Sequence, residues 1–345
     1  ASDVYKRQVF LHEMFRDNPF YRGIRTVVTI HNLRFQGVWD IPAMKRFTGL
    51  PDRAFTPDRL EFHRDANMLK GGLVYADRIT TVSGTYAWEI QQPSYGEGLD
   101  GLLRAKSGTL SGILNGIDYD IYDPVTDRKL YANYDKNGVR QGKAANKAAL
   151  QRELALPEDP EVMMVGMITR LTDQKGLDLV ERVMDWLLTS RIQLVIIGTG
   201  DKKYEDLFRR YEWERKEKVS ANIYFNDDRA HKLYAAADAM LMPSLFEPCG
   251  LTQLISLRYG TVPIVRETGG LKDTVEPYNE YVQTGTGFSF ANYNAEEMLD
   301  TIFYAERVFY DTRSCWDEMV RRGMEQDFSW RSSAQAYQSL YDQLG

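Results

Sequence analysis

Short apolar runs alternate with amphipathic stretches through the second half of the chain. Residues 162–168 form a nearly unbroken apolar run, which is too short for a helix and typical of a strand buried on both faces. The apolar residues of 177–188 fall on one helical face, and another short apolar run, 193–198, ends in glycine. Further strands are expected at 222–225, 239–242 and 262–265, with helices between them. Strands that alternate with helices predict a parallel, doubly wound sheet.

The first 117 residues carry the same pattern with fewer strands, at 26–30, 78–82 and 110–114. A doubly wound fold usually has about five or six strands, so three strands are too few for a complete domain of this kind. The first eight residues are polar and include no initiator Met. We therefore expect this half to be incomplete at its N-terminus.

Polar and helical segments complete the pattern. Residues 118–142 are rich in Asp, Tyr and Asn and predict a linker and surface loop, and 143–156 predicts a helix ahead of the second sheet. The tail, 315–344, predicts two helices with a break near 327–329.

Composition and charge narrow the class of protein. The 345 residues carry 43 basic and 49 acidic side chains, a net charge of −6, which disfavours a broad nucleic-acid interface. Cys249 and Cys315 are far apart in sequence, so neither a disulfide scaffold nor a zinc ribbon is expected. Because no apolar run approaches the roughly 18 residues that span a bilayer, we expect a cytoplasmic protein without a membrane partner.

Arg170 and Lys175 lie in the loop between a predicted strand and the following helix. Ligands of open α/β sheets bind at the carboxyl ends of the strands, and a helix N-terminus there favours a phosphate. The alternative is a pair of solvated loop cations. The sequence contains no G-x-x-x-x-G-K-[ST] motif, which disfavours a P-loop nucleotidase.

A second strand-to-helix loop, 243–253, contains Glu247. A carboxylate there can accept hydrogen bonds from sugar hydroxyls, and the amides of Gly250, Leu251 and Thr252 can face an anion. The alternative is a helix-capping region with a solvated glutamate. Cys249 is expected to be a buried packing residue, since no histidine is near it in sequence.

Glycines and a histidine mark further strand ends. The segment 266–271 follows the strand at 262–265, and its paired glycines, Gly269 and Gly270, permit either close approach to a ligand or a tight turn. His31 follows the strand at 26–30 and is either a ligand contact or a structural histidine. Residues 70–72 look like an anion-binding loop, but they precede a predicted strand rather than follow one, so a helix end or turn is expected there. Asp118 and Asp120 mimic a D-x-D metal motif, but they lie in the linker and are expected to be linker residues.

These segments closely resemble the bacterial glycogen synthases and plant starch synthases, retaining glucosyltransferases of the GT-B fold. The matching stretches are 29–37, 70–83, 95–103, 114–118, the loop with Arg170 and Lys175, 247–253 and 268–271. The resemblance runs from about Val9 to the C-terminus.

The resemblance implies a role for each candidate. Arg170 and Lys175 would hold the diphosphate of ADP-glucose, Glu247 would orient the glucosyl hydroxyls, and His31 would reach the donor glucose. Asn115 would contact the donor sugar near the domain junction. The remaining donor contacts would come from Gly250, Leu251, Thr252, Thr268, Gly269 and Gly270. No metal or other cofactor is implied.

The resemblance also implies a domain plan and an activity. Residues 1–117 would be an incomplete acceptor-side Rossmann-like domain, 118–325 the nucleotide-sugar domain, and 326–345 a helix crossing back to the first domain. The family's early Lys-x-Gly-Gly loop and His-Asp-Trp stretch have no match here, so we expect a fragment with impaired activity. The chain would transfer glucose from ADP-glucose to the non-reducing end of an α-1,4-glucan with retention. The alternative is a non-catalytic protein that binds ADP-glucose or glucan, and the oligomeric state is left open.

Overall fold

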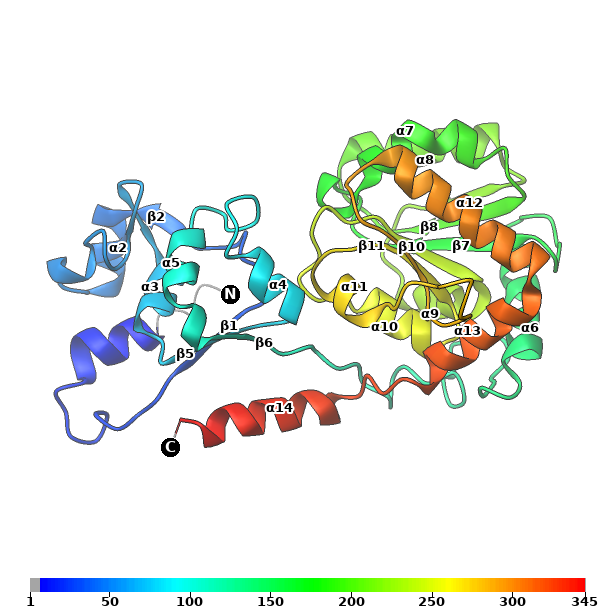
Figure 1. Cartoon of the computed structure of the whole chain (residues 1–345). Helices are drawn as coiled ribbons and strands as arrows, with labels where there is room; N and C mark the ends of the chain where they lie inside the picture. The colour runs from blue at the N-terminus through cyan, green and yellow to red at the C-terminus, as the bar shows by residue number, and fades with distance from the viewer. Residues whose placement is uncertain (1–6, 345) are drawn as a thin grey trace. The chain divides into compact units, whose positions relative to one another are not determined.

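The computed structural model describes residues 7–344 of the chain (Figure 1). These residues form two compact units. The first unit comprises the residues up to Leu114 together with those from Gln335 on, and the second unit runs from Asn115 to Ala334. Each helix within residues 7–344 is too short or too polar to span a bilayer.

The second unit is built on a six-stranded parallel sheet in the order β12-β11-β10-β7-β8-β9. Because successive connections run outward from β7 on one side and from β10 on the other, the strand order reverses between these two central strands. This is the topology of a doubly wound Rossmann-like fold, which confirms the expected fold class. The strands are β7 (Met163–Ile168), β8 (Ile192–Ile197), β9 (Val219–Asn222), β10 (Ala239–Met242), β11 (Val262–Arg266) and β12 (Phe288–Phe290).

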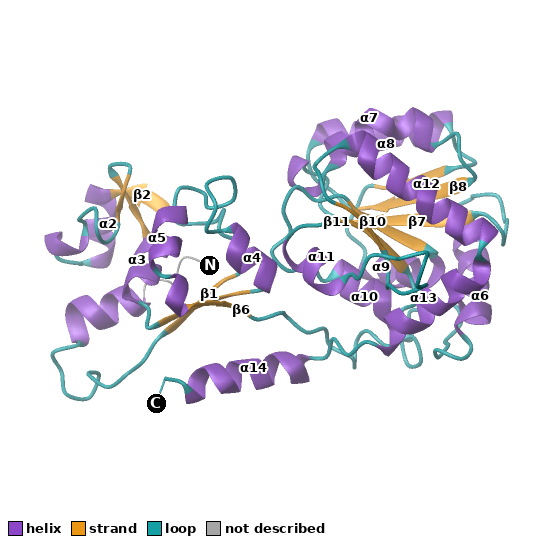
Figure 2. Ribbon diagram, viewed as in Figure 1, coloured by secondary structure: helices purple, strands orange, loops and turns teal. Residues whose placement is uncertain are grey.

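Helices cover both faces of this sheet (Figure 2). One face carries α7 (Leu177–Leu187), α8 (Lys202–Glu214) and α12 (Ala295–Asp311), and the other carries α9 (Asp227–Ala236), α10 (Thr252–Arg258) and α11 (Gly269–Thr274). The helices α6 (Val139–Glu153) and α13 (Arg313–Glu325) complete the second unit. The apolar faces of the helices of this unit pack on the strands and form one continuous core with them.

Two expectations for this unit were wrong in position. The strand expected at 222–225 is β9, which ends at Asn222, because Val219 is buried and pairs with Leu194 whereas Phe225 is 84% exposed. The segment 118–142 is not only a surface loop. Its Asp127 is buried, and one carboxylate oxygen lies 2.6 Å from both the His231 Nδ1 atom and the Tyr259 hydroxyl.

The first unit contains the three expected parallel strands, which pair in the order β1-β5-β6. A second, antiparallel sheet, β2-β4-β3, was not expected, because its strands are only two or three residues long. The strands are β1 (Val27–Ile30), β5 (Arg78–Thr81), β6 (Leu110–Gly112), β2 (Val38–Asp40), β3 (Glu61–Phe62) and β4 (Asp65–Asn67). A π-helical segment, Leu11–Phe15, comes first in the chain. The α-helices are α2 (Ile41–Thr48), α3 (Met68–Tyr75), α4 (Gly84–Glu89), α5 (Asp100–Ala105) and α14 (Trp330–Asp342), whose residues from Gln335 on belong to this unit.

Residues 70–72 lie inside α3 rather than at a helix end or turn, which corrects the expectation for them. Gly71 and Gly72 are buried there, and a side chain at Gly71 would meet Leu60 and Val9 at 2.9 Å. The Lys70 ammonium donates to the Pro57 and Glu61 carbonyls. The small residues therefore permit close helix packing and form no anion-binding loop.

Candidate active site

The carboxyl ends of β7 and β10 bring two of the predicted segments together. Lys175 ends a short 3₁₀ helix, Asp173–Lys175, that follows β7, and Glu247 lies in the loop that follows β10. The point at which the strand order of an open α/β sheet reverses is where such folds bind ligands. About 70 residues separate the two side chains in sequence, yet the pairing of β7 with β10 makes their loops neighbours.

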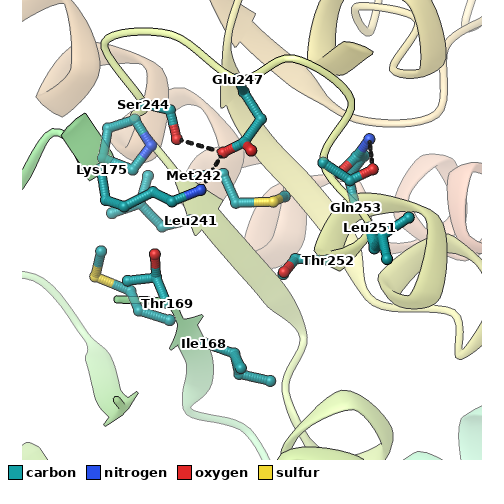
Figure 3. A pocket seen from close by; sticks show the side chains of 13 residues that line it. Ile168, Thr169, Lys175, Leu241, Met242, Ser244, Glu247, Leu251, Thr252 and Gln253 are labelled. Atoms are coloured by element: carbon teal, nitrogen blue, oxygen red, sulfur yellow. Dashed lines mark hydrogen bonds and ion pairs between the residues drawn. The ribbon is translucent and has the colours of Figure 1, made fainter. Parts of the chain in front are cut away.

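Lys175 and Glu247 form an ion pair, with the Nζ atom 2.5 Å from Oε2 (Figure 3). The same carboxylate oxygen accepts a hydrogen bond of 3.0 Å from the buried Ser244 hydroxyl. The two charged side chains are only 17% and 14% exposed, so solvent screens the pair weakly. The site thus presents a cation and a carboxylate in fixed positions.

Backbone contacts hold the two loops against each other. Gly176 adopts a positive φ of 71°, and a Cβ atom there would lie 2.0 Å from the Pro243 carbonyl oxygen, so only glycine fits. The Leu245 amide donates to the Gln174 carbonyl at 2.9 Å. The position of Lys175 is therefore coupled to the loop that carries Glu247.

Arg170, the other predicted cation, lies in the same loop but is exposed. Its guanidinium reaches the side-chain oxygen of the buried Gln174 at 3.5 Å, which is a weak hydrogen bond. It is not among the described residues that line the pocket beside Lys175. The side chain is thus free to reorient towards a ligand.

The pocket beside the ion pair encloses about 430 Å³, part of it open solvent (Figure 3). Its lining includes Lys175, Glu247 and the predicted residues Gly250, Leu251 and Thr252, at the start of α10. The first amides of a helix have no intrahelical acceptor and point out of its N-terminus. The pocket therefore combines a cation, a carboxylate and backbone donors.

The paired glycines after β11 support the Glu247 loop from behind. Gly269 has a φ of 44°, and a Cβ atom there would lie 1.9 Å from the Glu247 carbonyl oxygen. The Gly270 amide donates to that carbonyl at 3.1 Å. Thr268, Gly269 and Gly270 are buried, so this turn closes the corner of the site as part of the protein's own packing.

Arg266 and Tyr293 also shape the site, although neither was among the predicted residues. The Arg266 guanidinium donates to the Leu245 carbonyl at 2.6 Å and lies 5.6 Å from the Tyr293 ring centre. The Tyr293 hydroxyl donates to Asp178, near the start of α7, at 2.5 Å. Arg266 opens the segment 266–271 that the sequence already marked, but Tyr293 carries no sequence signal.

Cys249 and Asn115 meet at the edge of this loop. Burial raises the pKa of the Cys249 thiol to about 11, while a hydrogen bond with the Asn115 backbone opposes the shift. A thiol with that pKa is protonated near neutral pH and is a poor nucleophile. The thiol is thus a packing group, and its hydrogen bond brings Asn115 to the loop of Glu247.

His31, the predicted residue from the first unit, follows β1 directly and is exposed. The next turn is held in place, because the Asn32 side chain accepts from the Arg34 amide at 3.0 Å and the Leu33 amide donates to the Tyr86 hydroxyl at 3.1 Å. The imidazole therefore stands at the carboxyl edge of its sheet with its ring in solvent.

Comparisons with known proteins place both units in one family. Residues 7–105 match the starch synthase catalytic domain, and residues 146–307 match the glycosyl transferases group 1. A glycogen synthase of Lachnospira eligens is 61% identical over 97% of this chain and 70% of its own length, and one of Lachnoclostridium phytofermentans is 55% identical over the same shares.

Solved structures agree with this placement. The catalytic domain of starch synthase IV from Arabidopsis thaliana, bound to ADP and acarbose, has a TM-score of 0.91 at 31% identity, covering 99% of this chain and 71% of that chain. An Anabaena protein, Alr3699/HepE, in complex with UDP-glucose has a TM-score of 0.60 at 13% identity over 99% of this chain and 77% of that one, which shows a shared fold alone. The GT-B fold and the 61% identity to a glycogen synthase over 97% of the residues together establish that this chain belongs to the glycogen synthase family of hexosyltransferases.

Proposed function

We propose that this chain transfers glucose from ADP-glucose to the non-reducing end of an α-1,4-glucan, with retention of configuration. The observation that carries the proposal is the Lys175–Glu247 ion pair at the reversal point of the parallel sheet. Family membership supports the reaction, and the ADP and acarbose bound to the Arabidopsis starch synthase support the choice of adenine nucleotide and glucan. We further propose domains at 1–117 and 118–325, with 326–345 as a returning helix.

In the proposed donor complex, Lys175 and Arg170 bind the diphosphate. Negative charge on the diphosphate grows as its bond to glucose breaks, so two cations beside it stabilise the transition state more than the ground state. The first-turn amides at Gly250, Leu251 and Thr252 add donors to the same charge. The turn at Thr268, Gly269 and Gly270 packs against the loop of Glu247 and holds that loop in place.

Glu247 orients the glucosyl hydroxyls in this proposal and does not attack the sugar. Its Oε2 atom already accepts from Lys175 and Ser244, and these two hydrogen bonds lower the nucleophilicity of a carboxylate. We therefore propose that the acceptor 4-hydroxyl attacks on the same face from which ADP departs. His31 and Asn115 are proposed contacts of the donor glucose.

Calorimetric titration with ADP tests the donor site. Arg170→Ala and Lys175→Ala should each weaken ADP binding by about 1–3 kcal/mol, the range for charge-assisted hydrogen bonds. Lys272→Ala is the matched control, because this lysine of α11 is 54% exposed and pairs only loosely with Glu267, at 3.6 Å. Added salt should also weaken ADP binding to the unchanged protein. If both variants bind ADP as tightly as the unchanged protein, the site assignment is wrong.

Incorporation of labelled glucose into glycogen, measured on the same samples, tests the reaction. Lys175→Ala should reduce transfer by about 100-fold or more, as expected when a group that stabilises transition-state charge is removed. ADP binding without measurable transfer by the unchanged chain would instead favour the non-catalytic alternative.

A further inference from the structure

A large pocket lies at the edge of the six-stranded sheet opposite to the candidate donor site. Its lining comes from α6, the end of α12 and α13 (Figure 1), and from four residues just before β7, β10 and β11, namely Pro160, Glu161, Asp238 and Gly260. Lys175 and Glu247, by contrast, follow the carboxyl ends of β7 and β10, and the six residues of β7 span about 20 Å. The two sites are therefore separate, and we call this one the amino-edge pocket.

Basic side chains outnumber acidic ones in this lining, although the whole chain has a net charge of −6. The basic residues are Lys136, Arg140, Lys143, Lys147, Arg313 and Arg321, and the acidic ones are Glu161, Asp238, Asp317 and Glu318. Lys136 and Arg321 both pair with Glu325, at 3.1 and 2.8 Å, so the excess charge rests on the other four basic residues. A concave surface with an excess of one charge raises the local concentration of ions of the opposite sign. The amino-edge pocket therefore favours an anion.

Two lysines of α6 bring buried positive charge to the pocket. The Lys147 ammonium lies 2.6 Å from an Asp238 carboxylate oxygen. Within residues 7–344, the four acceptors of the Lys143 ammonium are all neutral: three backbone carbonyls and the Thr261 hydroxyl, at 2.7 Å. Two buried cations thus share one carboxylate. Burial lowers the pKa of Lys143 to about 7, and an anion in the pocket would oppose this effect of burial.

Two arginines from different helices supply the donors for such an anion. Arg140 on α6 and Arg313 on α13 approach the same carboxylate, that of Asp317, at 3.8 and 3.2 Å. The Arg313 guanidinium also lies 4.2 Å from the Phe309 ring centre, which holds it in place. A guanidinium carries five N–H donors, so one shared carboxylate leaves most of these donors unused. Two guanidiniums in this arrangement can together bind the oxygens of a phosphate group.

The size and the apolar part of the lining indicate a ligand larger than a phosphate ion. The pocket encloses about 1300 Å³, part of it open solvent, and pockets for small organic ligands usually measure about 300–1,000 Å³. Its apolar lining residues are Val139, Ala144, Phe309, Trp316 and Val320. Apolar walls with a few convergent charged groups suit a phosphate ester, whose carbon part packs on the walls while its phosphate meets the arginines.

We propose that the amino-edge pocket binds a small phosphate-bearing molecule through Arg140 and Arg313. The phosphate group is the shared chemistry of two sources, free phosphate and a phosphate ester, and the apolar walls favour the ester. Because such a ligand binds only the folded state, its binding should stabilise the second unit. The proposal goes beyond the proposed function and does not depend on it, since no residue of the donor site takes part.

Calorimetric titrations with ribose 5-phosphate, inorganic phosphate and ribose test the pocket. The unchanged chain should bind ribose 5-phosphate, inorganic phosphate more weakly, and ribose not at all. Arg140→Gln and Arg313→Gln should each weaken the binding of ribose 5-phosphate by about tenfold, the loss expected for one charge-assisted hydrogen bond. Ribose 5-phosphate should also raise the Tm of the second unit in the unchanged chain, and by less in both variants. Equal affinity for inorganic phosphate would support the pocket and identify free phosphate as its ligand.

Two further variants serve as controls. Arg182→Gln is matched to Arg140→Gln, because both arginines are about 70% exposed and Arg182 lies on α7, outside the pocket, paired with Glu296. Lys175→Ala removes the cation of the donor site and should leave the binding of ribose 5-phosphate unchanged. The proposal is wrong if the unchanged chain binds neither phosphate compound, or if Arg140→Gln binds ribose 5-phosphate as tightly as the unchanged chain does. It is also wrong if Arg182→Gln or Lys175→Ala loses as much affinity as Arg140→Gln.

Discussion

The two units of this chain use the same kind of strand but support it differently. In the second unit, six parallel strands are covered on both faces, and every residue of β8, β10 and β11 is buried in one continuous core. In the first unit, three parallel strands and a small antiparallel sheet share two separate core clusters. All three residues of β2 are exposed.

A parallel sheet needs helices on both of its faces, because its strands are apolar on both sides. The candidate donor site depends on the well-covered sheet, since Lys175 and Glu247 follow two strands at its centre. His31, by contrast, follows a strand in the smaller sheet. We therefore expect the second unit to be the more stable one, with independent thermal unfolding of the two units by calorimetry.

Removing a core side chain from each unit should give the largest effect. Leu194 in β8 and Ile79 in β5 are both fully buried, and truncating such side chains to alanine costs about 2–5 kcal/mol. Leu194→Ala should lower only the Tm of the upper thermal transition, which we assign to the second unit. Ile79→Ala should lower only the Tm of the lower transition, which we assign to the first unit. A single transition that both variants shift equally would show that the units unfold together.

Protonation of Lys143 should make the stability of the second unit depend on pH. Complete burial lowers its pKa to about 7 from 10.5, the value expected in the unfolded chain. Between these values the unfolded state binds more protons, so the free energy of unfolding should rise with pH by about 1.4 kcal/mol per unit. The rise should begin near pH 7 and level off near the unfolded value.

Lys143→Met should remove that slope in the upper transition, and Lys202→Met should keep it, because Lys202 is 84% exposed. Chemical denaturation at several pH values from 7 to 10 measures both. The same slope in Lys143→Met and the unchanged chain would contradict the assignment to this ammonium, which lies 2.7 Å from the Thr261 hydroxyl and 3.1 Å from the Ala235 carbonyl.

Gly269→Ala should separate the site from the fold that carries it. The new Cβ would press on the Glu247 carbonyl at 1.9 Å and occupy an unfavourable positive φ, at a cost of about 1–3 kcal/mol. Displacing this loop should weaken ADP binding by calorimetry while far-ultraviolet circular dichroism keeps its native form. Gly138→Ala is the control, because its Cβ would make only an ordinary contact of 3.5 Å. Unchanged ADP affinity in Gly269→Ala would show that the turn does not position the site.

Helix caps offer the smallest and most closely matched comparison. The Asp40 side chain accepts from the Ala43 amide at the start of α2, and the Asn226 side chain accepts from the Arg229 amide at the start of α9. Loss of such a cap costs about 1 kcal/mol. Asp40→Ala should shift only the lower transition and Asn226→Ala only the upper one, by a few degrees each in calorimetry. A shift of the other transition in either case would contradict the assignment of transitions to units.

Strands with strong periodic signals were predicted correctly from sequence. The apolar runs at 162–168, 193–198, 239–242 and 262–265 became β7, β8, β10 and β11 with ends within one residue. The hydrophobic pattern misled where a strand was very short or where apolar residues continued beyond the end of a strand. β12 has only three residues, and the apolar and aromatic residues after Asn222 drew the expected strand past the end of β9.

Local sequence was enough to mark Lys175 and Glu247 as candidates, because each follows a parallel strand and such positions lie at the carboxyl edge of the sheet whatever the strand order. That these two side chains meet follows from the strand order, which the sequence did not reveal. Strand order placed β10 beside β7, and that adjacency joins Lys175 to Glu247 and Ser244. Gln174, Arg266 and Tyr293, which help to hold the loops of the site, were not predicted from sequence for the same reason. Each of them contacts a partner that lies far away in sequence. The local hydrophobic pattern determines whether a segment is a helix or a strand and where it ends. Contacts between distant elements arise only when the whole core is buried.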